Sequence, residues 1–161
     1  MKVVFDTNIL VSSLIIPASP PNRVYEAWRG GTFVLVTCDE QFEEFRRVTR
    51  YDKLREYIEP AAAGTLLNEL RKVAQRIGKL PKVKRSPDAG DDYLLALAQA
   101  ADADYLVTGD RSGLLALKRH GKTRIVTARQ FSTAITPKPR PRTRLRASEP
   151  PASPRRTPRD S

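Results

Sequence analysis

Cysteine, histidine and long apolar runs are nearly absent from this 161-residue chain, and each shortage excludes a class of protein. The single cysteine, Cys38, has no partner for an internal disulfide and no metal-binding cluster around it, which predicts a reducing, cytoplasmic setting. No apolar run approaches the ~20 residues that span a bilayer. The N-terminus lacks the basic segment, apolar run and cleavage site of a leader. We therefore expect a cytoplasmic protein without disulfides or membrane contact.

Acidic residues are scarce beside basic ones, since 18 Asp and Glu face 29 Lys and Arg for a formal charge of +11. This balance favours a polyanionic partner, of which nucleic acid is the commonest. Residues 137–161 contribute +6 of that charge and residues 1–136 only +5. Because residues 137–161 are rich in Pro, Arg, Ser and Thr with almost no apolar side chain, we predict a disordered tail there.

Apolar segments of two kinds alternate along residues 1–136. Short unbroken runs, typical of strands buried on both faces, occur at residues 3–5, 33–36, 104–108 and 124–127. Segments with helical spacing separate them, and residues 93–101 are apolar nearly all round. Strands alternating with helices predict an α/β fold with an all-parallel sheet, in one domain over residues 1–136. Residues 80–83 are predicted as a short edge strand.

Aspartates stand where these strands end and helices begin. Asp6 follows the first strand, Asp110 follows the strand at 104–108, and Asp91 and Asp92 open the apolar helix. Ligands of open parallel sheets gather at the carboxyl ends of the strands, so these side chains are placed for chemistry. Two alternatives stay open. Asp6 or Thr7 can act only as a helix cap, and Asp91 can bind where Asp92 caps, although we favour Asp92 as the ligand.

A glutamate on the helix that follows the second strand joins this group. Phe42, Phe45 and Val48 define the buried face of that helix. At roughly 100° per residue, Glu44 lies at the edge of this face, whereas Glu43 points to solvent. Glu44 is therefore the glutamate expected beside the aspartates.

Carboxylates that converge on one point repel one another unless a cation lies among them. Mg²⁺ and Mn²⁺ prefer oxygen ligands and are commonly held by a few carboxylates together with substrate phosphate oxygens. Two such ions ~3.5–4 Å apart can generate a hydroxide and stabilise the leaving oxygen of an in-line displacement. A two-ion carboxylate site in a basic protein therefore predicts a phosphodiester substrate.

The segments around these acids resemble the PIN domain, and more narrowly the VapC-like ribonuclease toxins of prokaryotic toxin–antitoxin systems. The resemblance covers about residues 1–135 and rests on four segments in order, residues 4–12, 43–44, 91–98 and 104–110. It implies a three-layer α/β/α sandwich with a parallel sheet and a Mg²⁺- or Mn²⁺-dependent endoribonuclease that cleaves single-stranded RNA. It also implies a homodimer and a cognate antitoxin as partners.

The same resemblance assigns roles to individual residues. The catalytic metal ligands that it implies are Asp6, Glu44, Asp92 and Asp110. The resemblance also implies that Thr7, Asn8 and Thr108 are polar residues that orient these ligands and their waters. Asp91 stands beside them. Ser112 departs from the pattern, because close relatives often carry a second aspartate at that position. A second ion would then be held more loosely.

Two other functions compete with the nuclease, and the sequence disfavours the second of them. Ser112 favours a catalytically weak or silent module that binds RNA or a protein partner. An aspartyl-phosphate enzyme would want a second acid two residues after Asp6, where Asn8 stands instead.

Basic residues and the single histidine receive weaker assignments. Arg85, Arg111 and Lys118 are placed to steer the RNA backbone. The arginines of residues 137–161 either tether RNA or serve as a linker or antitoxin contact. His120 lies in a polar, basic turn and is expected on the surface rather than as a general base.

Overall fold

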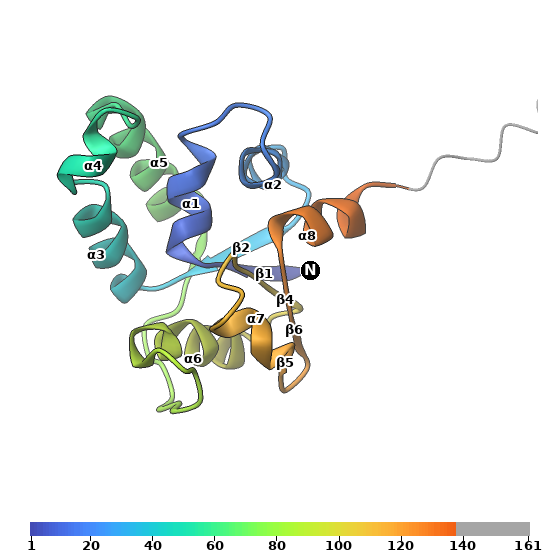
Figure 1. The fold of residues 1–161 in the computed structure, drawn as a ribbon. Coiled ribbons are helices and arrows are strands. Elements are labelled where there is room, and N and C mark those ends of the chain that lie inside the picture. The colour runs from blue at the N-terminus through green and yellow to red at the C-terminus, as the bar shows by residue number, and fades with distance from the viewer. Residues whose placement is uncertain (138–161) are drawn as a thin grey trace, which may run out of the picture.

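A computed structural model describes residues 1–137, in which strands and helices alternate (Figure 1). The strands are β1 (Lys2–Phe5), β2 (Val34–Thr37), β3 (Gln75–Arg76), β4 (Tyr105–Val107), β5 (Arg119–His120) and β6 (Thr123–Val126). The helices are α1 (Thr7–Ser13), α2 (Pro20–Arg29), α3 (Asp39–Val48), α4 (Asp52–Arg55), α5 (Pro60–Val73), the 3₁₀ turn η1 (Ala89–Asp91), α6 (Asp92–Ala101), α7 (Leu114–Leu117) and α8 (Ala128–Ile135). The predicted tail, residues 137–161, lies outside the described residues apart from Pro137.

The strands form one six-stranded sheet in the order β3-β2-β1-β4-β6-β5. The pairs β3–β2, β2–β1, β1–β4 and β4–β6 are parallel, which confirms the predicted α/β fold. The prediction of an all-parallel sheet is wrong at one edge, where β5 runs antiparallel to β6. Gly121, with φ +59°, turns the chain back between them in a conformation that suits glycine. His120 thus lies on β5.

The opposite edge of the sheet also differs from the prediction. Residues 80–83 form no strand, and the edge strand is β3, a few residues earlier, paired with β2. Pro81 has no N–H to donate to a strand ladder, which explains the loss. Leu80 and Val83 instead pack their side chains against the core beneath the sheet.

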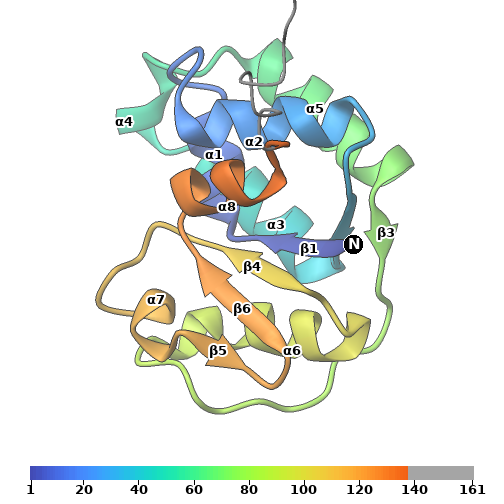
Figure 2. The same ribbon diagram turned by 90° about the vertical axis from the view of Figure 1, so that its right-hand side faces the viewer.

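Helices cover both faces of the sheet, as the predicted three-layer sandwich requires (Figures 1 and 2). Val3 and Phe5 point into a core shared with α1, α2, α3, α5 and α8, whereas Val4 points into the core under α6 and α7. Three leucines of α6 are fully buried, and each contributes roughly 1.5–3 kcal/mol relative to an exposed position. None of the helices in residues 1–137 is long and apolar enough to cross a membrane. This packing brings the carboxyl ends of β1, β2 and β4 to one edge.

Candidate active site

Asp6 stands at the carboxyl end of β1 and caps α1, and the cap occupies only one of its two carboxylate oxygens. Its Oδ1 accepts from the backbone N–H of Asn8 at 3.1 Å, and its Oδ2 accepts from the hydroxyl of Thr108 at 2.8 Å. The residue is only 4% exposed. Burial raises the pKa of Asp6, the two hydrogen bonds lower it, and the charges of Glu44 and Asp110 raise it further.

Asp110 is linked to Asp6 through Thr108, the residue that follows β4. The buried Thr108 hydroxyl donates to Asp6 and accepts from the backbone N–H of Asp110 at 3.2 Å. Asp110 Oδ1 in turn accepts from the N–H of Gly113 at 3.1 Å. A Cβ atom at Gly113 would stand 1.9 Å from Asp110 Oδ2, so a glycine there is what leaves room for the carboxylate.

The two aspartates at the start of α6 lie in different surroundings. Asp92 Oδ1 accepts from the N–H groups of Arg85 and Ser86, at 3.0 and 2.7 Å, and these bonds hold the pKa of Asp92 below its usual value. Asp92 thereby ties down the preceding loop. Burial raises the pKa of Asp91 to about 7, with further contributions from the charges of Asp6, Asp88, Asp110 and Glu44.

The charges of Asp6, Glu44 and Asp110 act on the pKa of Asp91, whereas none of them is among the causes of the pKa shift of Asp92. The loop at residues 85–86 accounts for the difference, because its two backbone N–H groups both donate to Asp92 and not to Asp91. The sequence favours Asp92 as the ligand and leaves Asp91 as the alternative, and both remain predictions.

Glu44 reaches the site from α3 and is held by a tyrosine. The phenol of Tyr93 donates to Glu44 Oε1 and accepts from the hydroxyl of Thr7, which lies 2.9 Å away. Burial and the bond to Glu44 raise the pKa of Tyr93, so its proton stays in place. Arg47 approaches the other oxygen of Glu44 at 3.9 Å. Tyr93 thus joins α1, α3 and α6.

Three residues of this arrangement went unnoticed in the sequence. Tyr93 follows Asp92 directly, and Gly113 follows Asp110 by three positions, but neither spacing is a recognised signal. The third is Gln41, fully buried on α3, which accepts from Thr37 at 2.8 Å and donates to the carbonyl of Phe5 at 2.5 Å. It fixes the end of β1 just before Asp6.

The remaining predicted residues lie at the margin of the site. Ser112 is exposed, with its hydroxyl 3.5 Å from Asp110 Oδ1. Asn8 bonds Asp6 through its backbone N–H. Arg85 donates to the carbonyl of Arg119 at 2.6 Å and to Nδ1 of His120 at 3.0 Å, while burial and this guanidinium lower the pKa of His120. The contacts of His120 are thus with Arg85 and Gln99, not with the carboxylates.

The carboxylates of this edge supply the ligand type that a hard divalent cation prefers, although residues 1–137 hold no group of three or more Asp, Glu, His or Cys side chains placed close enough to bind a metal ion as they stand. The donors are all oxygens. The charges of Glu44 and Asp110 raise the pKa of both Asp6 and Asp91, and a cation would relieve that repulsion. This donor set fits Mg²⁺ or Mn²⁺.

A family model described as "PIN domain" matches residues 2–112, and that segment contains all of these carboxylates. The chain belongs to the PIN-domain family. The comparison with curated proteins gave no match. PIN domains are typically Mg²⁺- or Mn²⁺-dependent nucleases that bind RNA, which supports a nuclease-type hydrolase at that coarse level. The family predicted from the sequence is confirmed, whereas the toxin subgroup stays a prediction.

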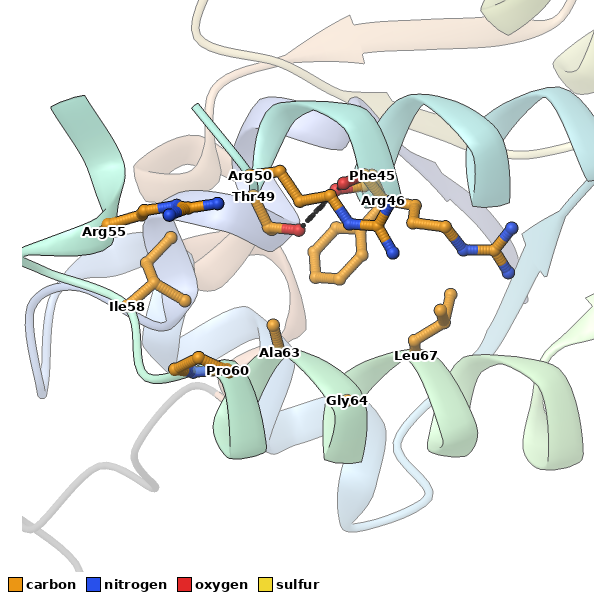
Figure 3. A pocket seen from close by; sticks show the side chains of 10 residues that line it. All are labelled: Phe45, Arg46, Thr49, Arg50, Arg55, Ile58, Pro60, Ala63, Gly64 and Leu67. Carbon is orange, nitrogen blue, oxygen red and sulfur yellow. Dashed lines mark hydrogen bonds between the residues drawn. The ribbon is translucent and has the colours of Figure 1, made fainter. Parts of the chain in front are cut away.

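A separate hollow of about 540 Å³ lies between α3 and α5 of this PIN domain (Figure 3). Its floor is mainly apolar, and Arg46, Arg50 and Arg55 stand around it. None of the site carboxylates lines it. The acidic group and this hollow are therefore distinct features, although both use α3.

Proposed function

We propose that this PIN-domain protein is a Mg²⁺- or Mn²⁺-dependent endoribonuclease that cleaves single-stranded RNA. The observation that carries the proposal is the group of Asp6, Glu44, Asp91 and Asp110 at the carboxyl edge of the sheet. Burial raises the pKa values of Asp6 and Asp91, and the charges of the neighbouring acids raise them further. The chain's formal charge of +11 favours a polyanionic substrate.

In this proposal Asp6, Asp91 and Asp110 hold the cation or cations, with Glu44 beside them. Bound Mg²⁺ or Mn²⁺ would supply a water of lowered pKa and neutralise charge that develops on the phosphate. The chain's own part is to hold the ligands still. Thr108 fixes one oxygen of Asp6, and Tyr93 fixes one oxygen of Glu44. Cleavage would leave a 5′-phosphate and a 3′-hydroxyl.

We extend the proposal to a cytoplasmic toxin that acts as a homodimer and is neutralised by a cognate antitoxin. What supports this finer assignment is the resemblance of residues 1–135 to the toxin subgroup. The RNA that is cleaved is left open by that resemblance.

A second candidate function is a catalytically weak or silent module that binds RNA or a protein partner. Ser112 favours it, because a neutral hydroxyl stands 3.5 Å from Asp110 where relatives often carry a carboxylate. Both candidates allow the protein to bind RNA, but only the first predicts that it cleaves the RNA.

Cleavage of an end-labelled single-stranded RNA tests the proposal, with Mn²⁺, with EDTA, and with the Asp6→Asn protein. We expect metal-dependent cleavage that the variant loses. Asparagine keeps an oxygen for the Asn8 N–H, so circular dichroism should show a folded protein. Full cleavage by folded Asp6→Asn protein would contradict the assignment, and binding without cleavage in either metal would favour the silent module.

A further inference from the structure

Two basic hollows flank α8, and the first of them lies close to the end of the sheet that carries the acids. The first hollow, of about 500 Å³, opens where β4 and β6 end. Arg111 follows Asp110 directly in the chain, and Thr127 follows β6. The residues that line it are Arg111, Leu115, Lys118, Ile125, Thr127 and Gln130.

The second hollow, of about 180 Å³, lies between α8 and α2, which pack together on the same face of the sheet (Figure 2). Arg23 comes from α2 and Arg129 from α8, and two hydroxyls stand with them, those of Ser132 and Thr133. Gln130 lines the first hollow and its neighbour in the chain, Arg129, lines the second, so the two hollows lie on adjoining faces of α8.

The four cations of these hollows are not committed to neighbouring acids. Within residues 1–137, no ion pair involves Arg23, Arg111, Lys118 or Arg129. Arg111, Lys118 and Arg129 are also exposed. By contrast, two of the three arginines around the hollow between α3 and α5 pair with acids on their own helices, Arg46 with Glu43 and Arg55 with Asp52.

We propose that the two hollows are successive sites for backbone phosphates of the RNA strand, which passes from the carboxylates over α8. The proposal rests on the proposed function and adds the path of the substrate. Guanidinium, ammonium and hydroxyl groups are the donors that phosphate oxygens take. Leu115 and Ile125 give the first hollow an apolar floor, on which a sugar or base can rest.

The hollow between α3 and α5 is a poorer candidate for this path. The hydroxyl of Thr49 already donates to the carbonyl of Phe45 at 2.9 Å. Phe45 itself is only 1% exposed, so it offers no ring face on which a base could stack.

Salt dependence of binding tests the path in the full chain. A fluorescein-labelled single-stranded RNA would be titrated in EDTA, which prevents cleavage, at several NaCl concentrations. Two double variants remove the charges of the two hollows beside α8, and we call them the α8 pairs. They are Arg111→Gln with Lys118→Gln and Arg23→Gln with Arg129→Gln. The matched control is Lys72→Gln with Lys79→Gln, near β3 at the opposite edge of the sheet.

Each phosphate contact to single-stranded nucleic acid contributes about 0.7 to the slope of log K against log salt. We therefore expect each α8 pair to flatten the slope by about 1.4 and the control pair to leave it unchanged. Equal effects of all three pairs, or no effect of either α8 pair, would overturn the path.

Cleavage measured in Mn²⁺ separates this proposal from the proposed function. If wild-type protein cleaves RNA while the α8 pairs bind with unchanged slopes, the path is wrong and the nuclease stands. If the slopes change as expected without any cleavage, the path stands and the nuclease is wrong. Failure of wild-type protein to bind RNA overturns the path.

Discussion

Two adjacent aspartates at the start of α6 do opposite work. Asp92 accepts two backbone N–H groups and holds the loop before the helix, whereas burial and the charges of other acids raise the pKa of Asp91. A single-residue comparison can therefore separate a structural carboxylate from a functional one.

We predict that Asp91→Asn abolishes metal-dependent RNA cleavage with no loss of thermal stability. Asp92→Asn should instead lower the melting temperature, because the charged acceptor for Arg85 and Ser86 is weakened, while part of the activity remains. Cleavage assays and thermal melts of the two proteins check this. The reverse pattern would restore Asp92 as the ligand.

Tyr93 makes a second residue-scale prediction. Tyr93→Phe removes the hydroxyl that joins Glu44 to Thr7. Loss of a group that orients a metal ligand typically costs 10–100-fold, so we expect Mn²⁺ affinity or the cleavage rate to fall by about that factor. Mn²⁺ binding by calorimetry and single-turnover cleavage measure the effect.

Tyr25 provides the matched control for Tyr93. Its phenol donates to Glu69 at 3.3 Å on the face of α2 and α5, in another tyrosine–glutamate pair. Tyr25→Phe should leave Mn²⁺ binding and cleavage unchanged. An equal loss in both variants would reduce Tyr93 to a general packing residue.

At the scale of elements, the turn between β4 and α7 positions Asp110 through Gly113. Gly113→Ala places a methyl group where Asp110 Oδ2 now lies, so the carboxylate must move away from the site. We predict a loss of cleavage of about 10-fold or more with the fold retained.

Gly64 in α5 offers the opposite result from the same substitution. A Cβ there meets open space, and alanine is favoured over glycine within a helix by about 0.5–1 kcal/mol. Gly64→Ala should therefore raise the free energy of unfolding and leave cleavage unchanged. Chemical denaturation and the RNA assay compare the two proteins, and unimpaired cleavage by Gly113→Ala would argue against a role for Asp110.

The elements also show how far the sequence carries. Unbroken apolar runs predict β1, β2, β4 and β6, and with them the sheet edge at which Asp6 and Asp110 stand. The sequence does not predict which of Asp91 and Asp92 bonds the preceding loop, because that depends on where the N–H groups of residues 85–86 lie in the folded chain. The two-residue strands β3 and β5 carry too few side chains to leave a pattern. Tyr93 and Gly113 act through contacts that only the assembled elements create.

At the scale of the whole molecule, the raised pKa of Asp91 couples stability to pH. Its pKa is about 7 in the folded protein against 3.8 as the reference value, so the folded state binds the proton more tightly. Without metal, the free energy of unfolding should fall as pH rises from about 4.5 to 7.5. Asp6, whose pKa is also raised, acts in the same direction.

Thermal melts in EDTA across this range check the coupling. The decline should be smaller in Asp91→Asn, which has no proton to lose, and Mn²⁺ should reverse it in the wild-type protein by binding the charged form. A pH profile identical in both proteins would show that Asp91 titrates normally.

Both margins of the sheet end in strands of only two residues, β3 on one side and β5 on the other. Such short ends expose few unpaired backbone groups, so they give another chain almost nothing to extend. Self-association of this domain must therefore use side chains on helical surfaces rather than a sheet that continues from one molecule into the next.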